Sequence, residues 1–137
     1  AFTLMNSDVA TDRSIAFALS LQEASGTHEG QLREAFRRLH ARDAEAEEID
    51  ALTEHLRAME EHHRDAENAP DEVEYPTELE RSLVEEFSGQ EFQYTEILPG
   101  YRNYVADKKA VDVSPETRAL ADVCLLLFNS NEFVYVY

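Results

Sequence analysis

Four stretches of the chain carry apolar residues at intervals of three and four positions, the period that places them on one face of an α-helix. These stretches span residues 7–24, 27–41, 44–66 and 114–128. In the third stretch the apolar stripe runs from Ile49 to Met59, and it follows a group of acids that favour the start of a helix. We predict a helix over each of the four stretches.

Residues that commonly cap helices stand at the ends of these stretches. Asn6 or Ser7 can begin the first helix, and Thr27 can begin the second. Ser114 followed by Pro115 has the order of a cap and a proline in the first helical turn. We therefore expect helices to begin near these positions, and we expect the second helix to end at residues 41–43.

Residues 67–113 interrupt the helical pattern. Pro70 lies among acids between residues 67 and 74, a composition that favours a solvated linker. Between residues 90 and 113, apolar and aromatic residues follow neither the helical nor the strand period for long. This part of the chain is predicted to be an aromatic-rich insertion.

A short helix is predicted between the linker and the insertion, over residues 77–87. Thr77 and Glu80 match the capping-box pattern that begins many helices. Leu79, Leu83 and Phe87 follow at intervals of four and would line one face of that helix.

The end of the chain predicts an extended tail. Asn129 and Asn131 can satisfy the last carbonyl groups of the preceding helix and turn the chain. The aromatic residues of 133–137 would then return to the core, and Phe133→Ala should cost about 3–5 kcal/mol if its ring is buried.

The complete pattern predicts an all-α fold. We expect an irregular or orthogonal bundle of four to five helices with an aromatic-rich insertion and a short extended C-terminal tail. Residues 1–137 are interpreted as a single helical domain, with an acidic linker and insertion at about 67–113.

Composition limits the partners of this domain. The 137 residues are 43% hydrophobic and carry a formal net charge of −17. This charge repels nucleic acid phosphates and anionic lipid headgroups, so neither is expected as a partner. Apolar runs fall short of the roughly 18 residues that span a bilayer, and the few glycines lack the spacing of a nucleotide-binding loop. No membrane span and no nucleotide are predicted.

Histidines and acids of the third helix are the best candidates for a metal site. His55, His62 and His63 stand near Glu60 and Glu61. The pattern lacks both an HExxH motif and a pair of histidines at positions i and i+4, which zinc sites on helices use. Solvated histidines near the helix C-terminus are the simpler interpretation, so we assign no metal-binding residue.

Other reactive groups also have simpler interpretations. Cys124 lies on the apolar stripe of the last helix, where a thiol is usually inert. The acid pair Glu85 and Glu86 resembles many others in this chain, and residues 71–74 lack the spacing of a calcium-binding loop. We assign no catalytic residue and no cofactor.

Two groups of residues are candidates for contact with a partner. The first is a basic cluster, for which ion pairing with nearby acids is the simple explanation and docking of an acidic partner is the alternative. The second is a set of aromatic residues that either anchor the insertion or form a platform for a partner or glycan. The basic cluster consists of Arg33, Arg37, Arg38 and Arg42, with Glu45, Glu47 and Glu48 after it, and the aromatic set consists of Tyr75, Phe92, Tyr94, Tyr101 and Tyr104.

The last segment, residues 118–137, resembles a known family through its closing motif Asn-Ser-Asn-Glu-Phe-Val-Tyr-Val. The family is a planctomycete-specific domain of unknown function, found in large proteins that often carry a planctomycete-type cytochrome c domain. The opening residues 4–9 and the stretch 32–49, which contains a helix, an Arg-rich turn and an acidic helix start, are similar to that family too.

The resemblance implies a fragment from the C-terminus of a large exported bacterial protein, in the periplasm or at the cell surface. The chain begins at Ala1 without a Met or a basic leader, so we expect a targeting signal, if any, upstream. The resemblance transfers no catalytic residue, and the CxxCH haem motif of the accompanying cytochrome domain is absent here.

These observations predict a non-catalytic structural or interaction domain. Its partner would be the remainder of its own parent chain or another exported protein. Two alternatives stay open. One is part of an extracellular enzyme whose active site is completed by the missing N-terminal region, and the other is a metal-binding module.

Overall fold

The computed structural model describes residues 7–102 and 105–135, and it divides the chain into two compact units. The helical unit consists of Ala1–Asp71 and Asp107–Tyr137, and the hairpin unit consists of Glu72–Ala106. The prediction of a mainly helical chain is confirmed. The prediction of an all-α fold is wrong, because the hairpin unit contains a two-stranded antiparallel sheet.

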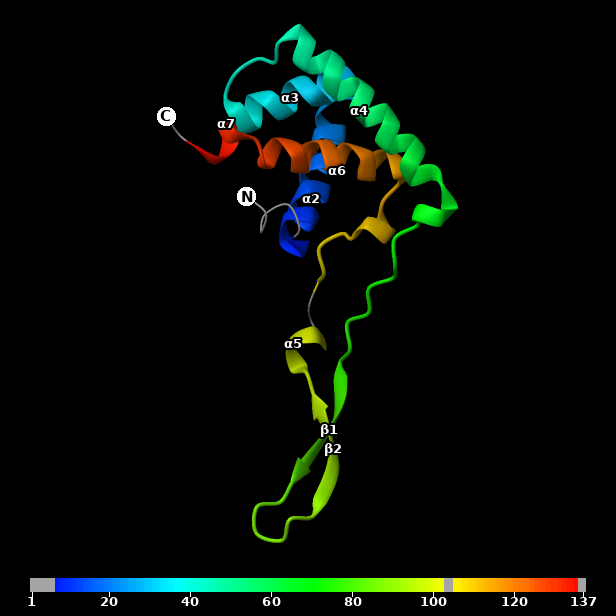
Figure 1. Ribbon diagram of the computed structural model, residues 1–137, viewed down its shortest axis with the longest axis vertical. Helices are drawn as coiled ribbons and strands as arrows, with labels where there is room; N and C mark the ends of the chain where they lie inside the picture. Colours follow the sequence, from blue (N-terminus) through cyan, green and yellow to red (C-terminus); the bar gives the residue numbers. More distant parts are fainter. Residues whose placement is uncertain (1–6, 103–104, 136–137) are drawn as a thin grey trace. The chain divides into compact units, whose positions relative to one another are not determined.

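Helix α6 is the centre of the helical unit, where it packs against both α2 and α4 (Figure 1). Helix α3 contacts α2 and α4 and completes the bundle. The long helices are α2 (Asp8–Ala24), α3 (His28–His40), α4 (Ala46–Arg64) and α6 (Pro115–Phe128), and the short ones are η1 (Ala66–Asn68), η2 (Ala110–Asp112) and α7 (Asn131–Val134). The four predicted long helices are therefore confirmed.

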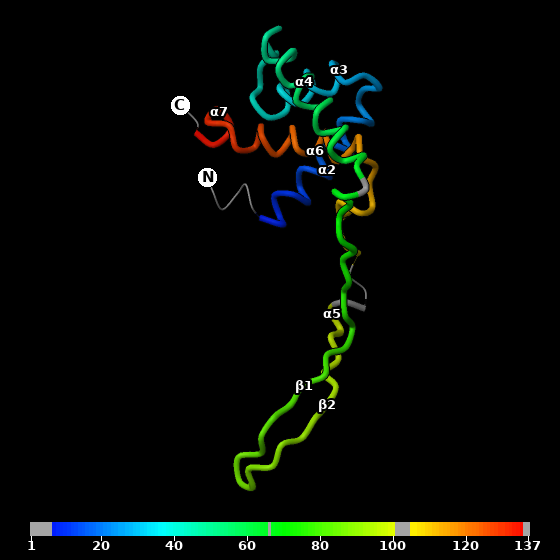
Figure 2. The backbone as a smooth tube through the Cα atoms, turned by 45° about the vertical axis from the view of Figure 1, so that its right-hand side comes forward, coloured from blue at the N-terminus to red at the C-terminus, as the bar shows by residue number. Residues whose placement is uncertain are grey.

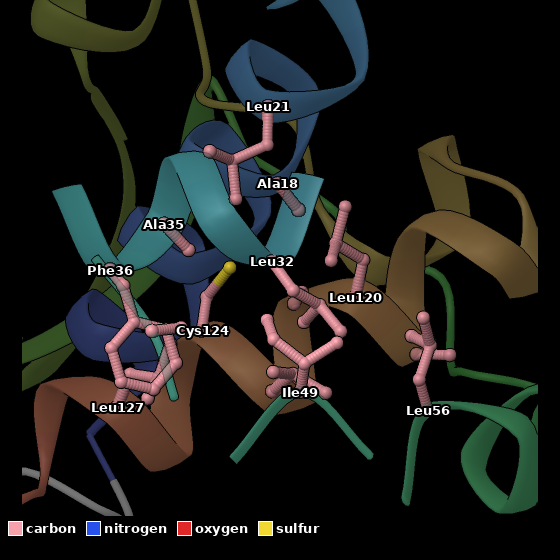
Figure 3. Close-up of a cluster of buried hydrophobic side chains, with 14 of the residues drawn as sticks. Ala18, Leu21, Leu32, Ala35, Phe36, Ile49, Leu56, Leu120, Cys124 and Leu127 are labelled. Atoms are coloured by element: carbon pink, nitrogen blue, oxygen red, sulfur yellow. The ribbon is translucent and has the colours of Figure 1, made fainter. Parts of the chain in front are cut away.

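One apolar core joins these four helices. Leu21, Leu32, Leu56 and Leu120 have at most 1% of their surface exposed, and Cys124 is fully buried among them. Figure 3 shows side chains from all four helices meeting in this cluster. Burial of such side chains is the main stabilising contribution to a helical bundle, at roughly 1.5–3 kcal/mol for each large one.

Capping groups fix the helix boundaries close to where the sequence predicts them. The hydroxyl of Thr27 accepts a hydrogen bond from the backbone N–H of Gly30 at 3.2 Å, and Ser114 accepts from Thr117 at 3.3 Å. Ala41 ends α3 with a left-handed backbone, at φ 55°. Ser7 precedes α2 as its N-cap residue, whereas Asn6 lies outside the described residues.

The predicted helix over residues 77–87 is wrong, because β1 (Glu78–Val84) occupies most of that segment. It pairs with β2 (Glu91–Ile97) in an antiparallel hairpin, whose two arms run side by side in Figure 2. An interval of four residues keeps side chains on one face of a helix and also on one face of a strand, so Leu79 and Leu83 fit both structures. The short helix α5 (Pro99–Arg102) follows the hairpin.

The predicted extended tail is also corrected. Residues Asn131–Val134 form the helical turn α7, for which the Ser130 hydroxyl accepts the N-terminal hydrogen bond from Phe133. Backbone angles become extended only at Tyr135, and Tyr137 lies outside the described residues. The ring of Phe133 contacts that of Phe128 at a tilt of 37°, with centroids 5.6 Å apart, yet 43% of the surface of Phe133 remains exposed. Its ring is therefore half-buried and not part of the core.

Candidate functional site

His62 and His63, two of the three histidines that are candidates for a metal site, have separate partners in the structure. The Nε2 of His63 lies 2.6 Å from a carboxylate oxygen of Asp122 on α6. The Nδ1 of His62 lies 3.2 Å from the side-chain amide of Asn68. His55 lines a surface pocket of about 400 Å³, together with Asp122 and residues of the last turns of α6. Within the described ranges, no three histidine, cysteine or acid side chains are grouped to hold a metal ion.

The acids near these histidines form ion pairs that connect α4 with neighbouring helices. Glu60 is 8% exposed and lies 3.3 Å from His28 and 3.4 Å from Arg64. Arg64 also donates to Glu116 on α6 at 2.9 Å, and this hydrogen bond lowers the pKa of Glu116 to about 2. This group of charges therefore has a packing role that joins α3, α4 and α6.

Cys124 is a buried, unreactive residue of the core, as the sequence predicts. Its side chain is fully buried, and burial raises the pKa of the thiol to about 12. The thiol therefore stays protonated at neutral pH, which removes its nucleophilic form.

Ion pairing explains the basic cluster. Arg33 and Arg38 pair with glutamates one turn earlier on α3, at 2.9 and 2.8 Å, and Arg37 pairs with Asp43 at 3.0 Å. Arg42 pairs with Glu48 at 2.7 Å. The prediction that the cluster pairs with the acids at the start of α4 is thus confirmed for Arg42, whereas the other three arginines have partners on their own helix, Arg37 in addition to Asp43.

Arg42 holds two carboxylates from different parts of the chain. Its guanidinium donates twice to Glu48 at 2.7 and 2.8 Å, and twice to Glu132 on α7 at 2.6 and 2.8 Å. It also lies over the ring of Phe36, 5.0 Å from the centroid. These hydrogen bonds raise the pKa of Arg42, lower that of Glu132, and lower that of Glu48 to about 2. Glu132 is absent from the predicted partners of Arg42, because it lies 90 residues away along the chain.

Next to Arg42, Ser130, His40 and Glu132 lie in a row, in the order nucleophile, base and acid. The Oγ of Ser130 is 3.1 Å from Nε2 of His40, and Nδ1 of His40 is 3.7 Å from Glu132. Such an order is the geometric signature of a hydrolytic triad, so its details decide between catalysis and packing.

The details favour packing. A separation of 3.7 Å is too long for a hydrogen bond, and Nδ1 of His40 accordingly has no hydrogen-bond partner among the described residues. Both carboxylate oxygens of Glu132 are held by Arg42. The Ser130 hydroxyl already accepts a hydrogen bond from the backbone N–H of Phe133. The contacts of His40 with Ser130 and Glu132 therefore attach α7 to α3.

The hairpin unit presents a different kind of surface. Leu83 lies opposite Phe92, and Arg81 lies opposite Tyr94. Because alternate residues of a strand point to the same face, most apolar side chains of the two strands share one face. We call it the hairpin apolar face. It consists of Leu79, Leu83, Phe92 and Tyr94, and the charged residues Arg81 and Glu96 lie on the same side of the sheet.

This face is largely open to solvent. Leu83 is 52% exposed, Phe92 is 49% exposed, and Phe87 in the connecting loop is 98% exposed. The rings of Phe92 and Tyr94 contact each other, with centroids 6.2 Å apart. Of the aromatic set in the sequence, these two lie on the hairpin apolar face and Tyr75 is also exposed, whereas the side chains of Tyr101 and Tyr104 lie outside the described part.

The opposite face of the hairpin is polar along most of its length. Glu80 lies opposite Thr95 and accepts its hydroxyl at 2.7 Å, and Ser82 lies opposite Gln93. Val84 and Ile97 are its apolar residues, one on each strand. The hairpin is therefore amphipathic, and its apolar side is a candidate contact surface.

Comparisons of the chain with protein-family models, with curated proteins and with solved structures find no match. The resemblance of residues 118–137 to the planctomycete family stays a prediction. No helix in the described part of the chain is long and apolar enough to cross a membrane.

Proposed function

We propose that this chain is a non-catalytic structural and interaction domain at the C-terminus of a large exported bacterial protein. The observation that supports the proposal is the uncovered hairpin apolar face. An isolated two-stranded hairpin is marginally stable in water, and exposed aromatic and aliphatic side chains in one group are typical of contact surfaces. Covering this face would therefore both stabilise the hairpin and attach a partner.

The side chains of the helical unit also favour a structural role. Its reactive side chains are engaged in packing: Cys124 in the core, His63 with Asp122, and Ser130 with His40. Such pairings stabilise helix contacts, and they leave these groups less available for chemistry. This distribution supports a structural role over a catalytic one.

The proposed partner is the remainder of the parent chain or another exported protein. The family resemblance of the closing motif supports this choice and a location in the periplasm or at the cell surface. The net charge of −17 argues against nucleic acid as an alternative.

Binding of this chain to the separately produced remainder of its parent protein, measured by calorimetry, tests the proposal. The double variant Leu83→Ser with Phe92→Ser should weaken binding by at least about tenfold, because apolar side chains at the centre of a contact contribute most of the affinity. Val84→Ser with Ile97→Ser on the opposite face is the matched control and should bind like the wild type.

Two results would contradict the proposed function. One is binding that is unchanged by the substitutions on the apolar face. The other is an enzymatic activity that arises on mixing and disappears in His55→Ala or Asp122→Asn, because these residues line the pocket beside α6. The second result would support the alternative of a shared active site.

A further inference from the structure

The charges around the hairpin indicate the chemistry of its partner, and this inference rests on the proposed function. We propose that the hairpin adds a protein strand at one of its edges, with apolar side chains that continue the hairpin apolar face and with lysines or arginines on its other side. The juxtaposition that supports this is an open apolar face on a hairpin whose glutamates, apart from Glu96, lack a cationic partner in the described structure.

Each strand of the hairpin has an outer edge that no described strand occupies. The sheet described here has two strands, so each strand uses one edge for its neighbour and leaves the other edge without a strand. Unpaired strand edges accept an added strand through main-chain hydrogen bonds, while alternate side chains provide specificity. An added strand whose apolar side chains lie on the same face as Leu83 and Phe92 would extend that face.

Most acids of the hairpin have no cationic partner among the described residues of their unit. Arg81 donates to Glu96 at 2.6 Å, the one ion pair between described side chains of this unit. The acids that have no cationic partner among the described side chains include Glu78, Glu80, Glu85, Glu86 and Glu91. Because the Debye length is about 8 Å at physiological ionic strength, acids in the loop and on the polar face act on the basic side chains of a strand added at the edge. A partner with basic side chains would therefore be attracted, and an acidic one repelled.

The same charges disfavour a second copy of this chain as the occupant. Two hairpins in contact would bring two sets of unpaired glutamates together, and each chain carries a net charge of −17. Like charges placed together across an interface cost several kcal/mol in general. The partner is therefore a different protein segment, one of opposite charge.

Three synthetic peptides of about nine residues, the length of a long strand, provide the test with the complete 137-residue chain. Each alternates valine with one other residue, which is lysine, glutamate or serine. The Val/Lys peptide should bind at least about tenfold more tightly than the Val/Glu peptide, and this preference should shrink in about 0.5 M salt. Fluorescence anisotropy of labelled peptides measures the affinities.

Matched variants locate the binding. Leu83→Ser with Phe92→Ser should abolish binding of the Val/Lys peptide, whereas Val84→Ser with Ile97→Ser should retain it. Glu86→Gln with Glu91→Gln should weaken binding about threefold or more. The control pair is Glu54→Gln with Glu61→Gln, two exposed glutamates of α4 in the helical unit, and it should change the affinity little.

Each outcome has a separate meaning. Equal binding of the three peptides, or no binding of the Val/Lys peptide, would overturn the inference about charge. Binding that persists in the Leu83 and Phe92 variant would overturn the location. In both cases the calorimetric test with the parent protein still decides the proposed function, because it depends on the natural partner and not on these peptides.

Discussion

The two units of this chain achieve order by different means. The helical unit buries Leu32, Leu120 and Cys124 almost completely, whereas the hairpin unit leaves Leu83 and Phe92 about half exposed. Both units contain apolar and acidic residues of similar types. An apolar stripe is therefore buried only where a second helix or sheet packs against it. The described hairpin unit contains a single two-stranded sheet and no second layer.

The largest expected effect separates the buried leucines from the exposed ones. Leu120→Ala removes a side chain that is 1% exposed in the helical core. We expect it to lower the free energy of unfolding by about 3–4 kcal/mol, through lost burial and a residual cavity. Leu83→Ala, at a leucine that is 52% exposed, should change it by less than about 0.5 kcal/mol. Urea denaturation measures both, and equal effects would contradict the division.

Removal of Arg42 should have the second-largest effect. Arg42→Ala leaves Glu48 and Glu132 close together without their shared cation, so we expect a loss of about 2–3 kcal/mol of unfolding free energy. Arg42→Lys should recover part of this loss, because it keeps the charge but not the paired hydrogen bonds. Thermal denaturation compares the variants. A fully stable Arg42→Ala protein would mean that solvent replaces the network at no cost.

Phe133→Ala should have a moderate effect. A fully buried ring would cost about 3–5 kcal/mol, but this ring is 43% exposed, so we expect about 1.5–2 kcal/mol. Phe87→Ala is the control in the hairpin loop, where the ring is 98% exposed, and it should have no measurable effect on the helical unit. Urea denaturation checks both variants, and a loss above 3 kcal/mol at Phe133 would restore the prediction of a buried tail.

Helices could be predicted from the sequence where capping residues and the later packing of the helix favour the same structure. Thr27 and Ser114 begin helices as predicted, because their hydroxyls cap groups only three residues away. The segment at Leu79 failed because an interval of four residues fits both a helix and a strand. Only the distant pairing with residues 91–97 decides for the strand.

The contacts of the candidate sites were harder to predict than the elements. Cys124 could be placed in the core from its helical stripe alone. The pairing of Arg42 with Glu132 could not, because it depends on how α7 returns to α3 and α4. The exposed hairpin apolar face also required the strand register, because the residues that share it come from two separate segments.

A smaller effect concerns acid stability. Hydrogen bonds from Arg42 lower the pKa of Glu48 from its usual 4.5 to about 2. Because the folded-state pKa is the lower one, the ionised carboxylate stabilises the fold fully above about pH 4.5, and this contribution is lost as the pH falls toward 2. Glu48→Gln should therefore be less stable than the wild type at pH 7, by about 1 kcal/mol. The difference should be largely lost near pH 2 and vanish below it, and denaturation curves over this pH range measure it. A constant difference at every pH would contradict the role of the charge.

The smallest effect on the helical unit is expected from a change confined to the hairpin. Gly89 in the loop between β1 and β2 has φ 69°, a backbone conformation that costs other residues roughly 1 kcal/mol or more. Gly89→Ala should therefore open the hairpin more often and speed amide hydrogen exchange in β1 and β2. It should change the unfolding free energy of the helical unit by less than about 0.5 kcal/mol. Gly26→Ala is the control, because an added Cβ meets no atom within 4 Å and the backbone there needs no positive φ. A loss of helical stability in Gly89→Ala that exceeds the loss in Gly26→Ala would mean that the two units unfold as one, and the comparison between them would then fail.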